Sequence, residues 1–207
     1  MSLAETLSEL LPPGTELAFG ELALSRSASG VFRARHTQDR DAGALQPIET
    51  VRELRELAKN DAAGEYRPLK TAPGLVGGWT TETDCPREFL KRLDAIYPGV
   101  FAAACAHAEG RADAVALRAT LDRQTGMYRF AGTISDEDAR RVVSEVCAAG
   151  CLRHVVWPIG VDEAPSPPPR DPGSIPLICL EACTFAVNKA RELAKEAFER
   201  SQAQAQA

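Results

Sequence analysis

Short apolar runs separated by turn residues mark the first forty residues of the chain. The runs lie at residues 17–19, 22–24 and 31–32, and Ser-Ala-Ser-Gly30 separates the last two. Runs of this length, bounded by glycine and serine, are typical of strands joined by tight turns. The pattern predicts a short β-meander over residues 16–38.

Beyond the meander, apolar residues recur three or four positions apart, which indicates helices. The first helix follows Pro47, a residue suited to a first turn, and ends near Asn60. From Tyr66 to Trp79, glycines and prolines interrupt every pattern, so we expect no regular structure there. Further helices are predicted over residues 86–96, 100–109, 136–150 and 180–201.

Local signals place the ends of these helices. Asp84 is positioned to cap the second helix. Ser135 with Asp138 resembles a capping box, and Gly150 is placed to end the helix that follows. Residues 113–125 fit a helix or a strand, because their apolar residues satisfy both spacings, and we expect a helix.

The order of elements predicts an α+β protein, in which a small N-terminal β-meander plus helix precedes a mainly helical region. We place the domain boundary near Thr81, with a small α+β domain over residues 1–80 and a helical domain over residues 81–201. The Gln-Ala repeat of residues 202–207 is expected to be a frayed tail.

Charge and composition narrow the classes of partner. A formal net charge of -5 and dispersed arginines argue against a nucleic-acid partner. No long apolar run is present, and the N-terminal residues lack the basic and apolar regions of a secretory signal. We therefore expect a cytoplasmic protein with no membrane partner. Persistent disulfides are rare in that compartment, so clustered cysteines indicate metal or redox ligands.

Four of the six cysteines form two pairs, each with three residues between its members. We call them the four paired cysteines: Cys147, Cys151, Cys179 and Cys183. The first pair lies where a helix ends, and a left-handed Gly150 would turn its second sulfur back toward the first. The second pair flanks the start of the last helix, where a spacing of four puts side chains on one face and the helix dipole stabilises thiolates.

The spacing leaves the bound group open. Both Zn²⁺ and iron–sulfur clusters accept four cysteines, and buried packing cysteines are a third interpretation. Cys85 and Cys105 have no close partner in sequence and are expected to be core or helix-flanking thiols. The sequence contains no nucleophile elbow, phosphate-binding loop or His-Glu-x-x-His motif. We therefore expect that the chain is not an enzyme in its own right.

Several segments resemble known domains. Arg123-Gln-Thr-Gly-Met-Tyr-Arg129, the Cys147-x-x-x-Cys-Leu-Arg153 segment with Trp157, and Cys179-Leu-Glu-Ala-Cys183 resemble the four-cysteine 4Fe–4S domain at the C-terminus of some sirohydrochlorin- or cobalt-chelatase-like proteins. Residues 62–70 and Gly77-Gly-Trp79 resemble the small stabilising domain that accompanies it. The resemblance implies one 4Fe–4S cluster on the four paired cysteines and favours it over Zn²⁺. The chain has no room for the chelatase modules themselves.

Polar and aromatic residues near the pairs are candidate neighbours of the site. They are Arg123, Arg129, Arg153, His154 and Trp157. The arginines are suited to donate to cluster sulfides or to an anionic partner, and the tryptophan to shield the site. With Arg118, the three arginines are expected to form a basic collar that docks an acidic donor.

We predict an iron–sulfur protein that transfers electrons or acts as an accessory in tetrapyrrole metallation. Its expected partner is a chelatase-like or redox protein. A zinc-stabilised interaction module is the alternative, in which the metal ties the last helix to the preceding one. A cluster-dependent enzyme whose substrate site needs a partner is the third interpretation.

Overall fold

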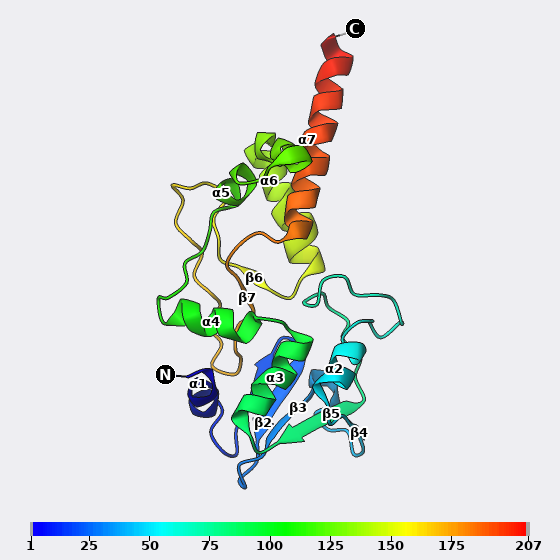
Figure 1. Cartoon of the computed structure of the whole chain (residues 1–207), viewed down its shortest axis with the longest axis vertical. Coiled ribbons are helices and arrows are strands. Elements are labelled where there is room, and N and C mark those ends of the chain that lie inside the picture. Colours follow the sequence, from blue (N-terminus) through cyan, green and yellow to red (C-terminus); the bar gives the residue numbers. More distant parts are fainter. Residues whose placement is uncertain (1, 206–207) are drawn as a thin grey trace. The chain divides into compact units, whose positions relative to one another are not determined.

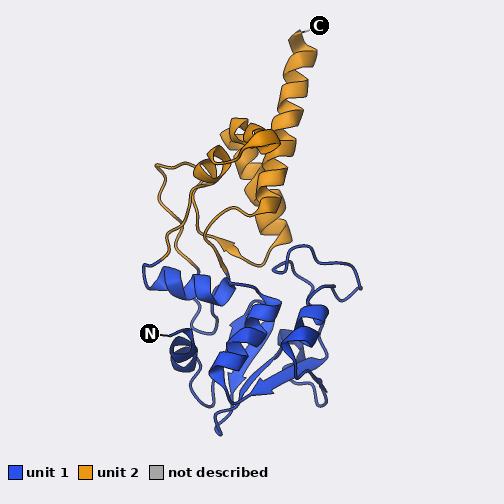
Figure 2. Cartoon of the chain, in the orientation of Figure 1, with its two compact units in different colours: residues 1–111, 169–177 blue, residues 112–168, 178–207 orange. Residues whose placement is uncertain are grey.

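The structure of the chain, a computed structural model, describes residues 2–205, which form two compact units (Figure 2). Unit 1 contains the chain up to Arg111 and the returning segment 169–177. Unit 2 contains residues 112–168 and the chain from Ile178 onward. The boundary expected near Thr81 and the observed division differ, because Thr81 lies inside a strand of unit 1 and two further helices pack within that unit.

Unit 1 is built on a mixed five-stranded sheet in the order β1-β2-β3-β5-β4 (Figure 1). Neighbouring strands are antiparallel, except that β4 and β5 are parallel. The predicted meander is confirmed as β1, β2 and β3, whereas β4 and β5 were not predicted as strands. The strands are β1 (Glu16–Phe19), β2 (Leu22–Arg26), β3 (Phe32–His36), β4 (Gln46–Pro47) and β5 (Trp79–Thr83).

Gly20 allows the tight turn between β1 and β2. Its φ of 61° lies in the left-handed region that favours glycine. A Cβ at this position would lie 2.9 Å from the Leu177 side chain and 3.0 Å from that of Tyr97. The turn therefore requires glycine both for its backbone and for the close approach of these two residues.

The returning segment 169–177 is hydrogen-bonded to β1. Ala18 N donates to Gly173 O, and Ile175 N donates to Ala18 O, each at 2.8 Å. These bonds hold the segment against the sheet of unit 1. The chain then enters unit 2 directly before Cys179.

The helices of unit 1 correct two expectations about helix starts. Pro47 lies in β4, so the expectation that it opens a helix is wrong; Thr50 caps α2 and forms a capping box with Glu53. Asp84 does not cap α3, because Cys85 occupies the N-cap position without a side-chain hydrogen bond. The helices of unit 1 are α1 (Leu3–Leu10), the 3-10 helix η1 (Thr37–Asp39), α2 (Val51–Leu57), α3 (Pro86–Ile96) and α4 (Val100–Ala108).

Two side chains order the long connection between α2 and β5. Arg67 is 2% exposed and donates to the carbonyl oxygens of Lys70, at 3.1 Å, and Ala72. The Glu21 carboxylate accepts from Gly74 N at 2.7 Å. Side chains thus satisfy backbone groups that no helix or strand satisfies here.

Unit 2 is mainly helical, which confirms the predicted α+β class with a helical C-terminal region. The helix predicted over residues 113–125 is confirmed as the shorter α5. The last helix continues to Ala205, so residues 202–205 of the expected tail are helical, and residues 206–207 lie outside the described part of the chain. The elements are α5 (Leu117–Asp122), the 3-10 helix η2 (Gly126–Thr133), α6 (Asp136–Val142), the π-helix η3 (Val143–Ala148), β6 (His154–Val155), β7 (Ile178–Cys179) and α7 (Thr184–Ala205).

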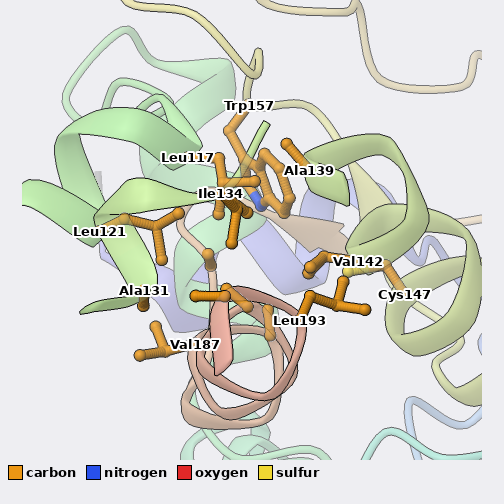
Figure 3. Packing of buried hydrophobic residues seen from close by; sticks show 14 of the residues in the cluster. Leu117, Leu121, Ala131, Ile134, Ala139, Val142, Cys147, Trp157, Val187 and Leu193 are labelled. Carbon is orange, nitrogen blue, oxygen red and sulfur yellow. The ribbon is translucent and has the colours of Figure 1, made fainter. Parts of the chain in front are cut away.

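The core of unit 2 lies between α7 and the helices that precede it (Figure 3). On α7 the buried residues are mostly small, including Ala186, Ala190 and Ala194, so that neighbouring elements approach closely. Leu117, Leu121 and the Trp157 ring fill the opposite side of this core. None of the helices within residues 2–205 has the length and apolar character that a membrane crossing requires.

Candidate metal centre

All four paired cysteines belong to unit 2. Cys147 lies in η3 and Cys151 directly follows the helix end, whereas Cys179 ends β7 and Cys183 directly precedes α7. Cys147 and Cys179 are buried, and the other two are half-buried. The two segments therefore deliver one deep and one shallower sulfur each.

A π-helical turn positions the first pair. Ser135 caps α6 by accepting from Asp138 N at 3.0 Å, as its capping-box pattern predicts, and the helix ends at Gly150 as expected. The expectation that Gly150 adopts a left-handed conformation is wrong, because this residue does not have a positive φ. Instead, Cys147 lies in η3, where hydrogen bonds span five residues and the turn is wider. The wider turn changes which side of the helix the last residues face.

A short parallel β-pair positions Cys179. Val155 in β6 pairs with Cys179 in β7, and Val156 N donates to Cys179 O at 3.2 Å. The strand corrects the expectation that both members of the second pair share a helical face, because only Cys183 adjoins the helix. Cys183 O accepts the first described backbone bond of α7, from Val187 N at 3.1 Å.

Two N–H groups donate to the sulfurs. Trp157 Nε1 donates to Cys179 Sγ at 3.3 Å, and the backbone N of Arg153 donates to Cys151 Sγ at 3.4 Å. The Cys179 thiol itself donates to Glu181 O at 3.2 Å. Both sulfurs are therefore already acceptors of the kind of hydrogen bond that stabilises a thiolate.

Burial and the neighbouring charges shift the pKa values of the two buried thiols. Burial, the largest cause, and the neighbouring Cys179, Cys183 and Cys151 thiols together raise the pKa of Cys147 to about 12. Burial also raises the pKa of Cys179, while the Trp157 hydrogen bond and the Arg153 charge oppose that rise. Because metal binding requires deprotonated thiols, cluster uptake would release these protons.

The donor set of this region consists of cysteine thiols, two of them buried and two half-buried. Within residues 2–205, no three His, Cys, Asp or Glu side chains are arranged to hold a single metal ion. One Zn²⁺ would require all four sulfurs at roughly 2.3 Å from the same position. The donor set, which is four thiols, fits a 4Fe–4S cluster, whose ligands are four cysteine thiolates.

The predicted neighbours of the site divide into three groups. Trp157 and Arg153 contact sulfurs, as described above. Arg123 forms an ion pair with Glu181, the residue whose carbonyl accepts from Cys179. Arg129 lies over the Phe130 ring at 5.2 Å, and His154 is exposed in β6; neither has a described bond to a paired cysteine.

Sequence reasoning missed Glu181. The available signal was its position between the members of the second pair. Its carboxylate pairs with Arg123, and its backbone carbonyl accepts from Cys179.

Arginines of the expected basic collar also have acidic partners: Arg123 pairs with Glu181, and Arg118 pairs with Asp136 at 2.7 Å. Two arginines of the expected basic collar are therefore balanced by carboxylates.

Cys85 and Cys105 belong to unit 1, unlike the four paired cysteines. Cys85 is exposed at the start of α3. Cys105 is buried in α4, and burial raises the pKa of its thiol. Their positions match the expected roles of a helix-flanking and a core thiol.

Comparisons with known proteins identify both halves of the chain. A family model of a 4Fe–4S iron–sulfur cluster binding domain matches residues 109–192, and a model of the DR2241 stabilising domain matches residues 5–109. The crystal structure of DR2241 from Deinococcus radiodurans is similar over 94% of this chain, with 28% identity and a TM-score of 0.76. That protein is described as a multi-domain protein with structural similarity to chelatases and two additional novel domains, and the match spans 40% of it. No curated protein matches the sequence.

Proposed function

We propose that this chain, which belongs to the DR2241 stabilising-domain family and carries a 4Fe–4S cluster-binding domain, holds one 4Fe–4S cluster through its four paired cysteines. The observation that carries the assignment is that Cys147 and Cys179 lie in one buried cluster of unit 2 and that Cys183 packs against the same cluster. The matched domain, residues 109–192, contains all four.

The donor set favours a cluster over Zn²⁺. The hydrogen bonds and charges around the sulfurs come from Trp157 and Arg153, which are donors and not metal ligands. N–H donors directed at sulfur are a recurrent feature of iron–sulfur sites, where they adjust the potential.

A bound 4Fe–4S cluster supplies one-electron redox chemistry. The chain's own residues hold it, shield it and determine which side is accessible. Trp157 and the apolar core keep water from the Cys147 and Cys179 side, whereas Cys151 and Cys183 are half-buried. Electron exchange with a partner is therefore expected on the Cys151 and Cys183 side of unit 2.

The proposed role is electron transfer to, or support of, a chelatase-like partner in tetrapyrrole metallation. Its support is that DR2241 resembles chelatases and that this chain spans 40% of its length. We therefore expect the partner to resemble the part of DR2241 that this sequence does not match. Titrating binding of a chelatase-like protein to the loaded chain at rising salt tests the role, and no binding at any salt would leave the cluster without this partner.

Iron and sulfide analysis tests the cluster directly. After anaerobic reconstitution, the wild-type chain should contain about four irons and four sulfides, with broad absorption near roughly 400 nm. Serine at any of the four paired cysteines should reduce that content. Cys85→Ser and Cys105→Ser are the matched controls and should retain it.

Three results would contradict the assignment. Zinc without sulfide in the purified protein would establish the zinc-stabilised alternative. Full iron and sulfide content in Cys179→Ser, or its loss in Cys105→Ser alone, would show that the ligand set is different.

A further inference from the structure

The indole of Trp157 and the sulfur of Cys179 form a buried hydrogen bond between residues far apart in sequence. Nε1 and Sγ are 3.3 Å apart, and the two residues are 3% and 8% exposed. The backbone bond from Val156 N to Cys179 O joins the residue before Trp157 to the end of β7, which carries Cys179. Figure 3 shows the Trp157 ring lying beside Leu117 and Ile134, so that packing also holds its orientation.

The sulfur is the acceptor that satisfies this N–H. A buried N–H group without an acceptor would destabilise the fold by roughly 1–3 kcal/mol. For Trp157 Nε1, that acceptor is Cys179 Sγ. When Cys179 binds a metal it loses its proton, and its own bond to Glu181 O ends. The indole bond remains, and it becomes stronger because its acceptor is then charged.

The hydrogen bond from Trp157 to Cys179 is also expected to affect the reduction potential of a bound cluster. One-electron reduction adds one negative charge to the group and its thiolates, and an N–H dipole pointing at a ligand sulfur stabilises the more negative state. The effect is large in a site that excludes water, because the local dielectric is low. We infer that Trp157 is a positioning residue that raises the reduction potential of the cluster through Cys179, an inference that rests on the proposed function.

Trp157 is the side-chain donor that mutation can test. The donor to Cys151 is a backbone N–H, which substitution does not remove. Phenylalanine at position 157 keeps an aromatic ring in the core and removes the N–H. The chain has two tryptophans, and Trp79 provides a matched control: it is 1% exposed, lies in unit 1 and donates to Val76 O at 2.6 Å.

Redox titration of the reconstituted chain, followed by EPR, tests the inference. Trp157→Phe should keep the wild-type iron and sulfide content and shift the reduction potential to a lower value. Trp79→Phe should lose a buried indole bond without shifting the potential. An unshifted potential in Trp157→Phe, or an equal shift in both variants, would overturn the inference.

A second measurement covers the case in which Trp157→Phe fails to take up the cluster. In the Trp79→Phe background, 5-fluorotryptophan labels position 157 alone. The fluorine withdraws electrons and makes the N–H a stronger donor, so the potential should rise above that of the unlabelled variant. A potential that stays the same or falls overturns the inference.

The iron and sulfide content of the wild-type chain distinguishes a failure of the proposed cluster binding from a failure of the proposed effect of Trp157. A wild-type chain that takes up neither iron nor sulfide overturns the proposed function and this inference with it. A fully loaded wild type whose variants show no shift overturns the inference alone.

Discussion

At the scale of single residues, Tyr97 combines apolar packing with one polar contact in the core of unit 1. Its ring meets Phe19 edge-on, with centroids 5.6 Å apart. Its hydroxyl oxygen accepts a hydrogen bond from Glu21 N at 3.1 Å. Burial is the main reason that the pKa of Tyr97 rises to about 12, and the nearby Glu21 charge adds to it. The neutral phenol is therefore part of the folded structure.

This pKa predicts a loss of stability at high pH. Above pH 10 the unfolded chain loses the Tyr97 proton, whereas the folded chain keeps it until about pH 12. The free energy of unfolding should therefore fall across that interval by up to about 3 kcal/mol. Urea unfolding at pH 9 and pH 11 measures it. Tyr97→Phe, the control, should show a smaller fall, and an equal fall in both proteins would contradict the prediction.

At the scale of elements, the start of α7 and its middle are expected to depend on different interactions. Its buried positions run from Ala186 to Ala194, and residues 198–205 are exposed. Cys183 adjoins its first turn, and Cys179 lies in the strand just before it. The middle of α7 is therefore held by the hydrophobic core, and the segment before it by the proposed ligand bonds.

Hydrogen exchange on loaded and iron-free protein should reveal this division. Removing the cluster should speed exchange at residues 147–151 and 178–184, because ligand binding and local folding are coupled there. Residues 187–194 should remain protected in both forms, and residues 198–205 should exchange rapidly in both. Equal protection of residues 178–184 in the two forms would contradict ligation by the second pair.

At the scale of the whole molecule, the chain contains two units that each have a hydrophobic core. Phe19, Phe32 and Phe89 lie in the core of unit 1, and Leu117 and Leu193 in that of unit 2. All four paired cysteines belong to unit 2. The stability conferred by a bound cluster should therefore belong to one unit.

Thermal unfolding followed by tryptophan fluorescence tests this expectation, because each unit contains one tryptophan. In Trp157→Phe, Trp79 reports on unit 1, and in Trp79→Phe, Trp157 reports on unit 2. Iron removal should lower the midpoint reported by Trp157, because binding to the folded state stabilises it. The midpoint reported by Trp79 should change by less than about 2 °C. Equal shifts in both would show that the units unfold together.

Local patterns in the sequence were sufficient for the elements that depend on short-range contacts. The meander, the N-cap at Ser135 and the helices over residues 86–96 and 100–108 follow from spacing and cap residues within a few positions. The predicted 4Fe–4S domain is shown by the family match. The four paired cysteines stand out because their repeated spacing is visible in the sequence itself.

Only the tertiary structure decided which distant segments meet. The strand β5, the pair β6 and β7, and the return of residues 169–177 to β1 depend on hydrogen bonds between segments that no local pattern connects. The bond from Trp157 to Cys179 joins residues 22 positions apart. The sequence by itself determined the meander, the main helices and the cysteine pairs, because propensity and capping act over one or two turns. The surroundings of each sulfur required the fold, because hydrogen bonding and burial depend on which segments pack together.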